Sequence, residues 1–582
     1  MNYIPCPNSQ NFGHIFRLKS VLLFGLIIIF AVNSIGKVMK KGTLFLWMIL
    51  LVSVPVQVGK SCTNILVSKG ASTDGSTMIT YAADSHVLYG ELYYYPAADH
   101  PAGTMLDVYE WDTGKYLGQI EQVSHTYKVV GNMNEHQLTI GETTFGGRSE
   151  LRDTTAKMDY GSLMYITLQR AKTAREAIQV IDDLLSEYGY YSSGESFSIA
   201  DPNEVWIMEM ISKGMHEKGA VWVARKLPDG YISAHANQAR IRQFPLDDPE
   251  NCLYSDDVID FAREMGYFDG KDKNFSFADA YAPLDYGALR FCEGRVYSVF
   301  NRAAPSQEMP MDYVKGEPGA EPMPLWIKPD QKLAVHDVME LMRDHFQGTE
   351  WDMTNGFGAG PFELPYRWRP LTWEVDGVEY CNDRAISTQQ TGFSFVSQSR
   401  SWLPDPIGGI LWFGVDDTYS TVYTPMYCNI TEIPGSFEVG NGGLYDFSWN
   451  SAFWVFNFVS NFTYLRYNMM IEDVREVQQN LELGFLLEQK AIENVALEMY
   501  NENPEKAIAY LTDYSVKQGD YTVQRWRKLG EQLLVKYIDG NVKVNGELTQ
   551  PGYSKKWYEH VVKESGDHFE MKKLPGEEDA GH

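Results

Sequence analysis

From residue 62 onward, the pattern of hydrophobic and polar positions is rich in strand signals. Residues 63–68 and 77–81 are short apolar runs on either side of Ser72-Thr73-Asp74-Gly75. This tetrapeptide is typical of a turn, so the segment predicts a β-hairpin. Farther along, SFSIADPNEVWIMEMI at 196–211 predicts two strands around an Asp-Pro-Asn turn.

Further strands are predicted in the middle of the chain. Residues 219–241 contain a Pro-Asp-Gly turn between apolar runs, and a second strand set includes 385–400 and 408–417. Between these strand regions, residues 300–335 are rich in Pro and Glu. Such a composition indicates a long excursion over the surface.

Helical patterns occupy two regions. Residues 161–189 carry apolar side chains at helical spacing and end at Gly189, so we expect one amphipathic helix there. From about 469 to 570 the composition is again helical, and the chain closes with the acidic tail GEEDAGH.

The order of these elements predicts an α+β fold with sheets covered by helices. We expect three parts, which are a targeting segment at 1–61, a main domain at 62–468, and a helical C-terminal region with an acidic tail at 469–582.

The N-terminal segment has the features of a secretion signal. Apolar runs at 20–32 and 43–56 are both shorter than the roughly 20 residues that a membrane-spanning helix needs. Met39-Lys40-Lys41 precedes the second run, which fits a signal peptide whose true start is Met39. The alternative is a two-helix hairpin anchor. With a signal, the protein is expected to be exported to the periplasm or the extracellular space and to meet the membrane only during export.

The net charge of the chain argues against one class of partner, the nucleic acids. The formal net charge is −27, and residues 1–61 contain six basic and no acidic residues. Removing these six from the 50 basic residues leaves 44 against 77 acidic residues, a net charge of −33. A surface this acidic repels phosphate backbones, so we expect no nucleic-acid partner.

Cysteines are sparse, and they lack metal-ligand spacing. The chain has six, and five remain if the targeting segment is removed, an odd number for an exported protein. One thiol is therefore left over from any pairing. No CxxC pair and no HExxH motif occurs, so we expect neither a metal nor another cofactor.

Cys62 stands where the signal ends, and three interpretations are open. A lipid anchor is one, although Gly59-Lys60-Ser61 fits a lipidation site poorly. A structural cysteine is the second. The third is a catalytic residue that becomes the new chain terminus. Its free α-amine, with a reference pKa of about 7.7–8.0, could then take the proton of its own thiol.

The residues around Cys62 resemble a known family. CTNILVSKGASTDGSTMITYAADS is similar to the start of the cysteine N-terminal-nucleophile (Ntn) dipeptidases, the group of dipeptidase A and the secernins. The resemblance continues in GNMNEHQLTIGETTFGGR, ISAHANQARI and LPDPIGGILWF, and so covers roughly 62–430. Penicillin V acylases and bile salt hydrolases are more distantly similar. The resemblance implies a four-layer αββα Ntn-hydrolase sandwich, here with a C-terminal helical extension.

The resemblance also implies site residues. Cys62 matches the nucleophile, Asp84 the acid that orients the terminal cysteine, and Asn237 the amide that faces the oxyanion. The alternatives are a solvated turn residue for Asp84 and a turn cap for Asn237.

The resemblance also implies site roles at other positions, where an alternative remains open. Thr143 or Thr144 matches a second oxyanion position, with an ordinary strand residue as the alternative. Arg295 matches a late active-site arginine or makes a surface salt bridge. Tyr81 stands where acylases and many dipeptidases have Arg, which leaves substrate preference open.

Taken together, we expect an exported cysteine Ntn-hydrolase that cleaves amide bonds, with a dipeptide as substrate. The alternatives are an N-acyl amide hydrolase acting on small acyl substrates, and a non-catalytic lipoprotein anchored to the membrane through Cys62.

Overall fold

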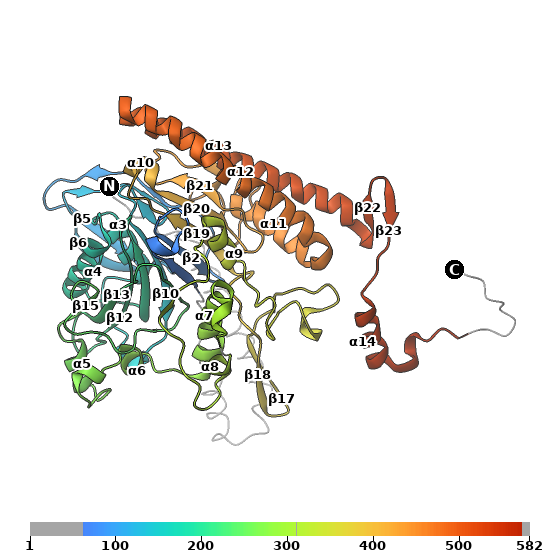
Figure 1. The fold of residues 1–582 in the computed structure, drawn as a ribbon, viewed down its shortest axis with the longest axis horizontal. Helices are drawn as coiled ribbons and strands as arrows, with labels where there is room; N and C mark the ends of the chain where they lie inside the picture. Colours follow the sequence, from blue (N-terminus) through green and yellow to red (C-terminus); the bar gives the residue numbers. More distant parts are fainter. Residues whose placement is uncertain (1–61, 310, 573–582) are drawn as a thin grey trace, which may run out of the picture.

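The computed structural model describes residues 62–309 and 311–572 (Figure 1). The predicted targeting segment at 1–61 and the last residues of the acidic tail, 573–582, lie outside the described residues. In the described ranges, every helix is too short or too polar to cross a bilayer.

Two antiparallel sheets form the body of the described chain. The first has seven strands in the order β16 (Trp326–Ile327), β14 (Ile232–His235), β1 (Asn64–Val67), β2 (Met78–Asp84), β19 (Thr391–Gln398), β20 (Ile410–Val415) and β21 (Thr424–Tyr427). The second has eight strands in the order β15 (Cys252–Tyr254), β13 (Ala220–Lys226), β12 (Val205–Ser212), β11 (Gly194–Ala200), β10 (Thr139–Phe145), β9 (Met133–Asn134), β8 (Val129–Val130) and β3 (Tyr94–Tyr95).

The two sheets pack face to face and carry helices on their outer sides. Strands β1 and β2 contact β10 and β11 of the other sheet. Helices α3 (Tyr160–Leu168) and α4 (Ala174–Tyr188) pack on β10–β13, while α9 (Val335–Leu341) and α11 (Ala452–Tyr464) pack on β19 and β20. Every residue of β2, β11 and β12 is buried, because both faces of these strands are covered. The predicted α+β class is confirmed.

Shorter elements surround this body. The short α-helices among them are α5 (Val258–Glu264), α6 (Phe277–Tyr281), α7 (Gly294–Ala303), α8 (Asp312–Lys315), α10 (Asp405–Gly408) and α14 (Lys555–Ser565). The small hairpins and ribbons pair β4 (Ala98–Asp99) with β7 (His125–Thr126), β5 (Met105–Tyr109) with β6 (Tyr116–Glu121), β17 (Thr372–Val375) with β18 (Val378–Cys381), and β22 (Val542–Val544) with β23 (Glu547–Thr549).

The predicted hairpin after residue 62 is confirmed as β1 and β2, which pair with Leu66 opposite Ile79. The single helix expected at 161–189 is wrong, because the chain breaks it into α3 and α4. Thr173 starts the second helix, since its hydroxyl accepts a hydrogen bond from the Glu176 amide at 3.2 Å. The Glu176 carboxylate also accepts from the amide of Lys172, the residue before the cap, at 2.8 Å.

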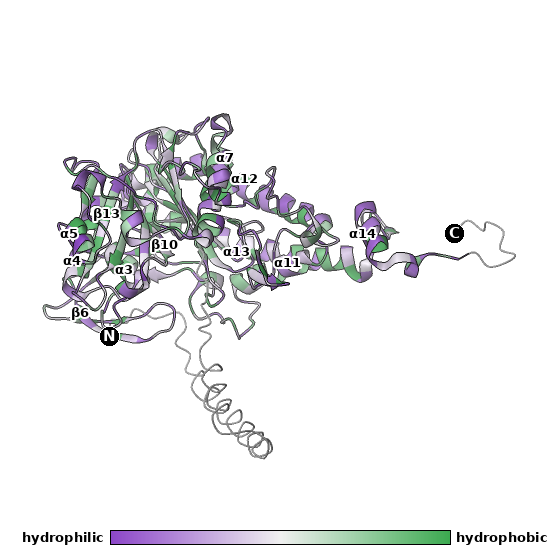
Figure 2. Ribbon diagram, turned by 90° about the horizontal axis from the view of Figure 1, so that it is seen from below, coloured by the Kyte–Doolittle hydropathy of each residue, from purple (hydrophilic) through white to green (hydrophobic). Residues whose placement is uncertain are grey.

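Two long helices, α12 (Tyr467–Glu502) and α13 (Pro504–Tyr537), run side by side along one edge of the body (Figure 1). Both contact β21, and α13 also packs on α11, where Phe456 stacks on Trp526 at 4.9 Å. Figure 2 shows hydrophilic and hydrophobic residues along both helices, as expected for helices with one packed side. The division at 468/469 stays a prediction.

A buried ion pair attaches α12 to the body. Arg343 Nη2 lies 2.5 Å from Glu482 Oε1, and neither side chain is more than 1% exposed. The same carboxylate oxygen accepts a hydrogen bond from the Tyr423 amide at 2.9 Å. Arg343 has a second partner in Glu340, at 2.8 Å.

We expect Glu482→Gln to destabilise the protein. Removing one partner of a buried pair typically costs roughly 3–5 kcal/mol, and Glu340 reduces this to about 2 kcal/mol by retaining part of the charge balance on Arg343. Chemical denaturation measures the free energy of unfolding. The matched control is Glu498→Gln on the exposed side of the same helix, which should change it little. Equal stability of the two variants would contradict the role of the ion pair.

Candidate active site

Cys62 lies at the start of the central hairpin. The Ala82 amide donates to the Thr63 carbonyl at 3.0 Å, which extends the pairing of β1 with β2 by one bridge. Continuing this antiparallel register puts Cys62 opposite Ala83 and next to Asp84. The Cys62 side chain is buried, with 5% of the residue exposed.

The nearest polar partners of the thiol are an acid and a phenol. Cys62 Sγ lies 3.5 Å from Glu142 Oε1 and 3.9 Å from the Tyr81 hydroxyl. The Tyr81 hydroxyl donates to the same Glu142 oxygen at 2.5 Å. Burial raises the pKa of the Cys62 thiol well above its usual value, and the carboxylates of Glu142 and Asp84 raise it further. The thiol is therefore protonated until a base removes its proton.

Asp84 is a buried, ion-paired residue. It ends β2 and is 0% exposed. Arg384 Nη2 contacts its Oδ2 at 2.6 Å, and the Thr391 hydroxyl donates to its Oδ1 at 2.7 Å. Burial raises the pKa of Asp84, and the Arg384 guanidinium opposes that shift. A solvated turn residue is thus the wrong interpretation for Asp84.

Arg295 connects the nucleophile to the end of β14. From α7 its Nη1 donates to the Cys62 carbonyl at 2.5 Å and to the Thr63 hydroxyl at 2.7 Å. Its Nη2 donates to the Ala236 carbonyl at 3.2 Å and to Asn237 Oδ1 at 2.9 Å. The side chain is buried, and burial lowers its pKa to about 10. The alternative of a surface salt bridge is wrong.

Asn237 is held at both ends of its amide. It follows β14 in the left-handed region, with φ 61°, which Asn tolerates better than most residues. Its Oδ1 accepts from Arg295, and its Nδ2 donates to the Thr144 carbonyl at 2.7 Å. An amide NH₂ has two hydrogens, so one further donor is available in this position.

The two threonines of β10 have different surroundings. The Thr143 hydroxyl hydrogen-bonds His235 Nδ1 at 2.7 Å, across to the other sheet. The Thr144 hydroxyl donates to Glu195 Oε2 at 2.9 Å. A role for either hydroxyl at the oxyanion stays a prediction.

The imidazole of His235 does not serve the thiol. Its two ring nitrogens hydrogen-bond Thr143 and Ser198, both at 2.7 Å. Burial lowers the pKa of His235 to about 3, so the ring is neutral and structural. Within 62–309 and 311–572, the hydrogen bonds of the Cys62 thiol go to Tyr81 and Glu142 and not to an imidazole.

Two charged residues of this site, Glu142 and Arg384, could not be identified from the sequence. Glu142 lies in the quoted segment GETTFGGR, but nothing local distinguishes it from an ordinary strand carboxylate. Arg384 is 300 residues away from Asp84 in the chain. Only the pairing of β2 with β19, which sets Asp84 opposite Thr391, brings the two together.

Comparisons with known proteins identify the family of this chain. The pattern of Peptidase family C69 matches residues 61–94 and 90–480. A probable dipeptidase of Latilactobacillus sakei is 24% identical over 393 residues, which cover 64% of this chain and 75% of the relative. A probable dipeptidase of Salmonella dublin is 25% identical, covering 63% and 81%. Probable dipeptidase B of Streptococcus pyogenes serotype M1 is 21% identical, covering 82% and 93%. This chain therefore belongs to peptidase family C69 and is a cysteine peptidase.

Proposed function

We propose that this protein is an exported Ntn-hydrolase that cleaves dipeptides with the Cys62 thiol as nucleophile. The observation that carries the proposal is a buried thiol that lies beside a carboxylate and a phenol instead of an imidazole. Such a thiol needs a base, and cleavage before Cys62 would create one on the same residue. The names of the similar bacterial proteins support a dipeptide as the substrate.

The layer order supports an αββα Ntn-hydrolase sandwich. Two facing sheets lie between helices, and Cys62 lies two residues before β1 of one of them. The strand that follows the nucleophile is held by main-chain pairing on both sides, since β1 lies between β14 and β2.

In the first half of the proposed reaction, the α-amine of Cys62 takes the thiol proton. Sγ then attacks the carbonyl carbon of the peptide bond, and the carbonyl oxygen becomes an oxyanion. The free N–H of Asn237 is the donor we assign to it. When the C–N bond breaks, the α-ammonium gives its proton to the leaving amine, and a thioester remains.

In the second half, water replaces the leaving amine. The α-amine takes a proton from water as the hydroxide adds to the thioester carbon. Collapse of this intermediate breaks the C–S bond, releases the second amino acid, and returns the proton to the thiol.

The surrounding charges would position the terminus. Asp84 lies beside Cys62 in the register and is fixed by Arg384 and Thr391, so its carboxylate can orient a new α-amine. Arg295 holds the Cys62 carbonyl and so fixes the backbone on the other side of the nucleophile. These two groups are positioning residues in the proposal.

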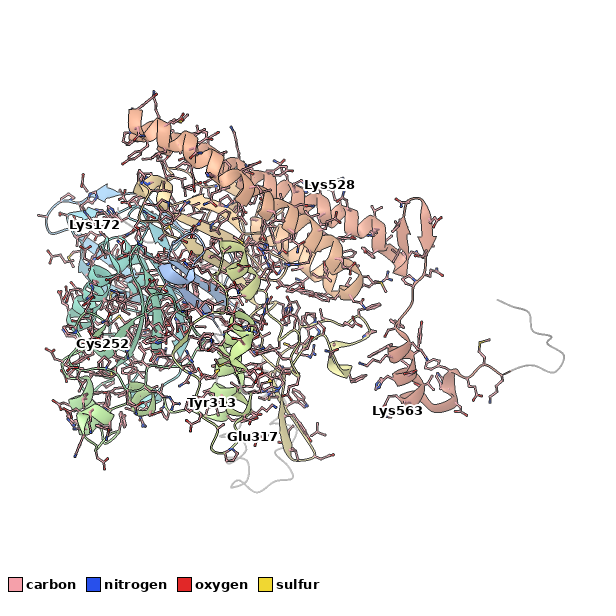
Figure 3. All side chains as sticks on the ribbon, viewed as in Figure 1. Lys172, Cys252, Tyr313, Glu317, Lys528 and Lys563 are labelled. Atoms are coloured by element: carbon pink, nitrogen blue, oxygen red, sulfur yellow. The ribbon has the colours of Figure 1, made fainter. Side chains whose placement is uncertain are left out.

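We expect Cys62→Ala to abolish dipeptide hydrolysis and Cys62→Ser to retain a slow rate, because serine is the weaker nucleophile. The matched control is Cys252→Ala. Cys252 is also buried but lies on β15, at the far edge of the other sheet (Figure 3). Steady-state rates of purified proteins with equal thermal stability provide the measurement. Turnover by the Cys62→Ala protein would rule out the mechanism.

The mature protein should begin at Cys62 with a free α-amine. Intact mass and N-terminal sequencing of protein purified from an exporting host measure this directly. A diacylated Cys62 would instead support the lipoprotein alternative, because its amine could not act as a base. A chain that stays uncleaved and is nevertheless active would also contradict the proposal.

The pH dependence of hydrolysis should report the protonation state of the Cys62 α-amine. Hydrolysis needs the neutral amine of Cys62, so kcat, measured at saturating dipeptide so that the titration of the free substrate does not enter, should rise with pH through about 7–8, the reference range of an α-amine. The rise should persist in Cys62→Ser, because a serine hydroxyl does not titrate there while the α-amine is retained. Loss of the rising limb in this variant would show that thiol ionisation sets the profile.

A further inference from the structure

We propose that Glu142 binds the α-ammonium group of the substrate, on the acyl side of the bond that is cleaved, and so selects free dipeptides over N-acylated compounds. This inference rests on the proposed function of Cys62 and adds the residue that recognises the substrate.

Covalent geometry limits where the substrate amine can lie. In an aminoacyl group the amine nitrogen is two bonds from the carbonyl carbon, a separation of about 2.5 Å. The attacking sulfur approaches that carbon to about 3–3.5 Å. The amine of a dipeptide therefore stays within about 6 Å of the thiol in any reactive pose. Glu142 Oε1, at 3.5 Å from Sγ, lies inside this range.

The Glu142 carboxylate is buried without a cation. The residue is 1% exposed, and its side-chain hydrogen bonds come from the Tyr81 hydroxyl at 2.5 Å and from the Cys62 thiol at 3.5 Å. The Thr144 hydroxyl also lies 3.4 Å from the carboxylate, but its single hydrogen is directed to the closer Glu195. In the part of the chain that the structure describes, no ion pair to Lys, Arg or His is formed by this carboxylate. Buried carboxylates are normally paired, so a cationic ligand is the missing partner.

Asp84 provides an internal comparison. It is another acid whose charge acts on the Cys62 thiol and is equally buried, yet Arg384 pairs with it at 2.6 Å. The fold thus supplies a cation to the acid that we assign to positioning. It leaves Glu142, the acid that faces the thiol directly, for a charge from outside the chain.

Tyr81 explains how the carboxylate is kept available. At this position beside the thiol, the chain has a phenol that donates to Glu142. An Arg beside Glu142 would neutralise it internally. Burial, the Cys62 thiol and Glu142 raise the pKa of Tyr81, so the phenol remains a donor and orients the carboxylate without cancelling its charge.

The test compares one dipeptide with its des-amino counterpart, in which hydrogen replaces the α-ammonium. The assay uses the processed protein, which begins at Cys62 and runs to the natural C-terminus. The substrate is the dipeptide that this protein hydrolyses fastest. Wild type should prefer the dipeptide by roughly 100-fold in kcat/KM, the scale of a buried charge pair. Glu142→Gln should lose most of that factor, so that the ratio of the two kcat/KM values approaches one, whatever common change the lost negative charge beside the thiol makes to both rates.

Tyr81→Phe is the matched variant, because it removes the hydrogen bond and keeps the carboxylate. It should retain the preference for the free amine even if both rates fall. If Glu142→Gln slows both substrates equally, Glu142 serves the Cys62 amine or the fold, and the inference is overturned. If Glu142→Gln does not fold, the ratio of the dipeptide rate to the des-amino rate in the wild-type protein decides. Equal rates, or a faster des-amino rate, overturn the inference. Activity retained in Cys62→Ala would instead overturn the proposed function.

Discussion

The site depends on the hydrogen bonds of the buried Arg295 guanidinium. It reaches the Cys62 carbonyl, the Thr63 hydroxyl and the Asn237 amide oxygen from one side chain, and so joins the start of β1 to the end of β14. A planar guanidinium offers five donors in fixed directions, which a lysine could not match. Because the group is fully inside the protein, it is satisfied only when these segments are in place. The positions of the nucleophile and the Asn237 amide are therefore set together.

Near Arg295, the two acids Asp84 and Glu142 differ in their partners, and this difference affects the ionisation of the Cys62 thiol. Asp84 has Arg384, whereas Glu142 has hydroxyl and thiol partners. The negative groups act on the thiol and help to raise the pKa of Cys62. An added cation next to Glu142 would relieve this repulsion and favour the thiolate. In the proposed mechanism, the substrate that brings an ammonium thus also eases ionisation of the nucleophile.

Local patterns in the sequence were sufficient for the hairpin that carries the nucleophile, because its turn and its strands are contiguous. Asp84 was assigned from the family resemblance, and the register of the hairpin, which continues past Thr63, places it next to Cys62. The partners of these residues could not be predicted, since Arg384 and Glu142 arrive through packing of distant strands. Similarly, the helix expected at 161–189 had the right apolar spacing, but the cap at Thr173 divided it. Tertiary pairing and capping chemistry, not hydrophobic periodicity, decided these points.

The same burial that orders the site also keeps it inactive before cleavage in the proposed mechanism. In the uncleaved chain the nitrogen of Cys62 is a peptide amide, which has no basicity, and the raised pKa of the thiol keeps the sulfur protonated. His235, the imidazole on the neighbouring strand, is neutral and bonded at both nitrogens, so it cannot substitute as a base. Cutting the bond before Cys62 changes one group only, from amide to amine, yet it supplies the missing base at the nucleophile itself. A site built in this way needs no rearrangement of its side chains to become active, because the scaffold around the new terminus is already formed by Arg295 and Asp84.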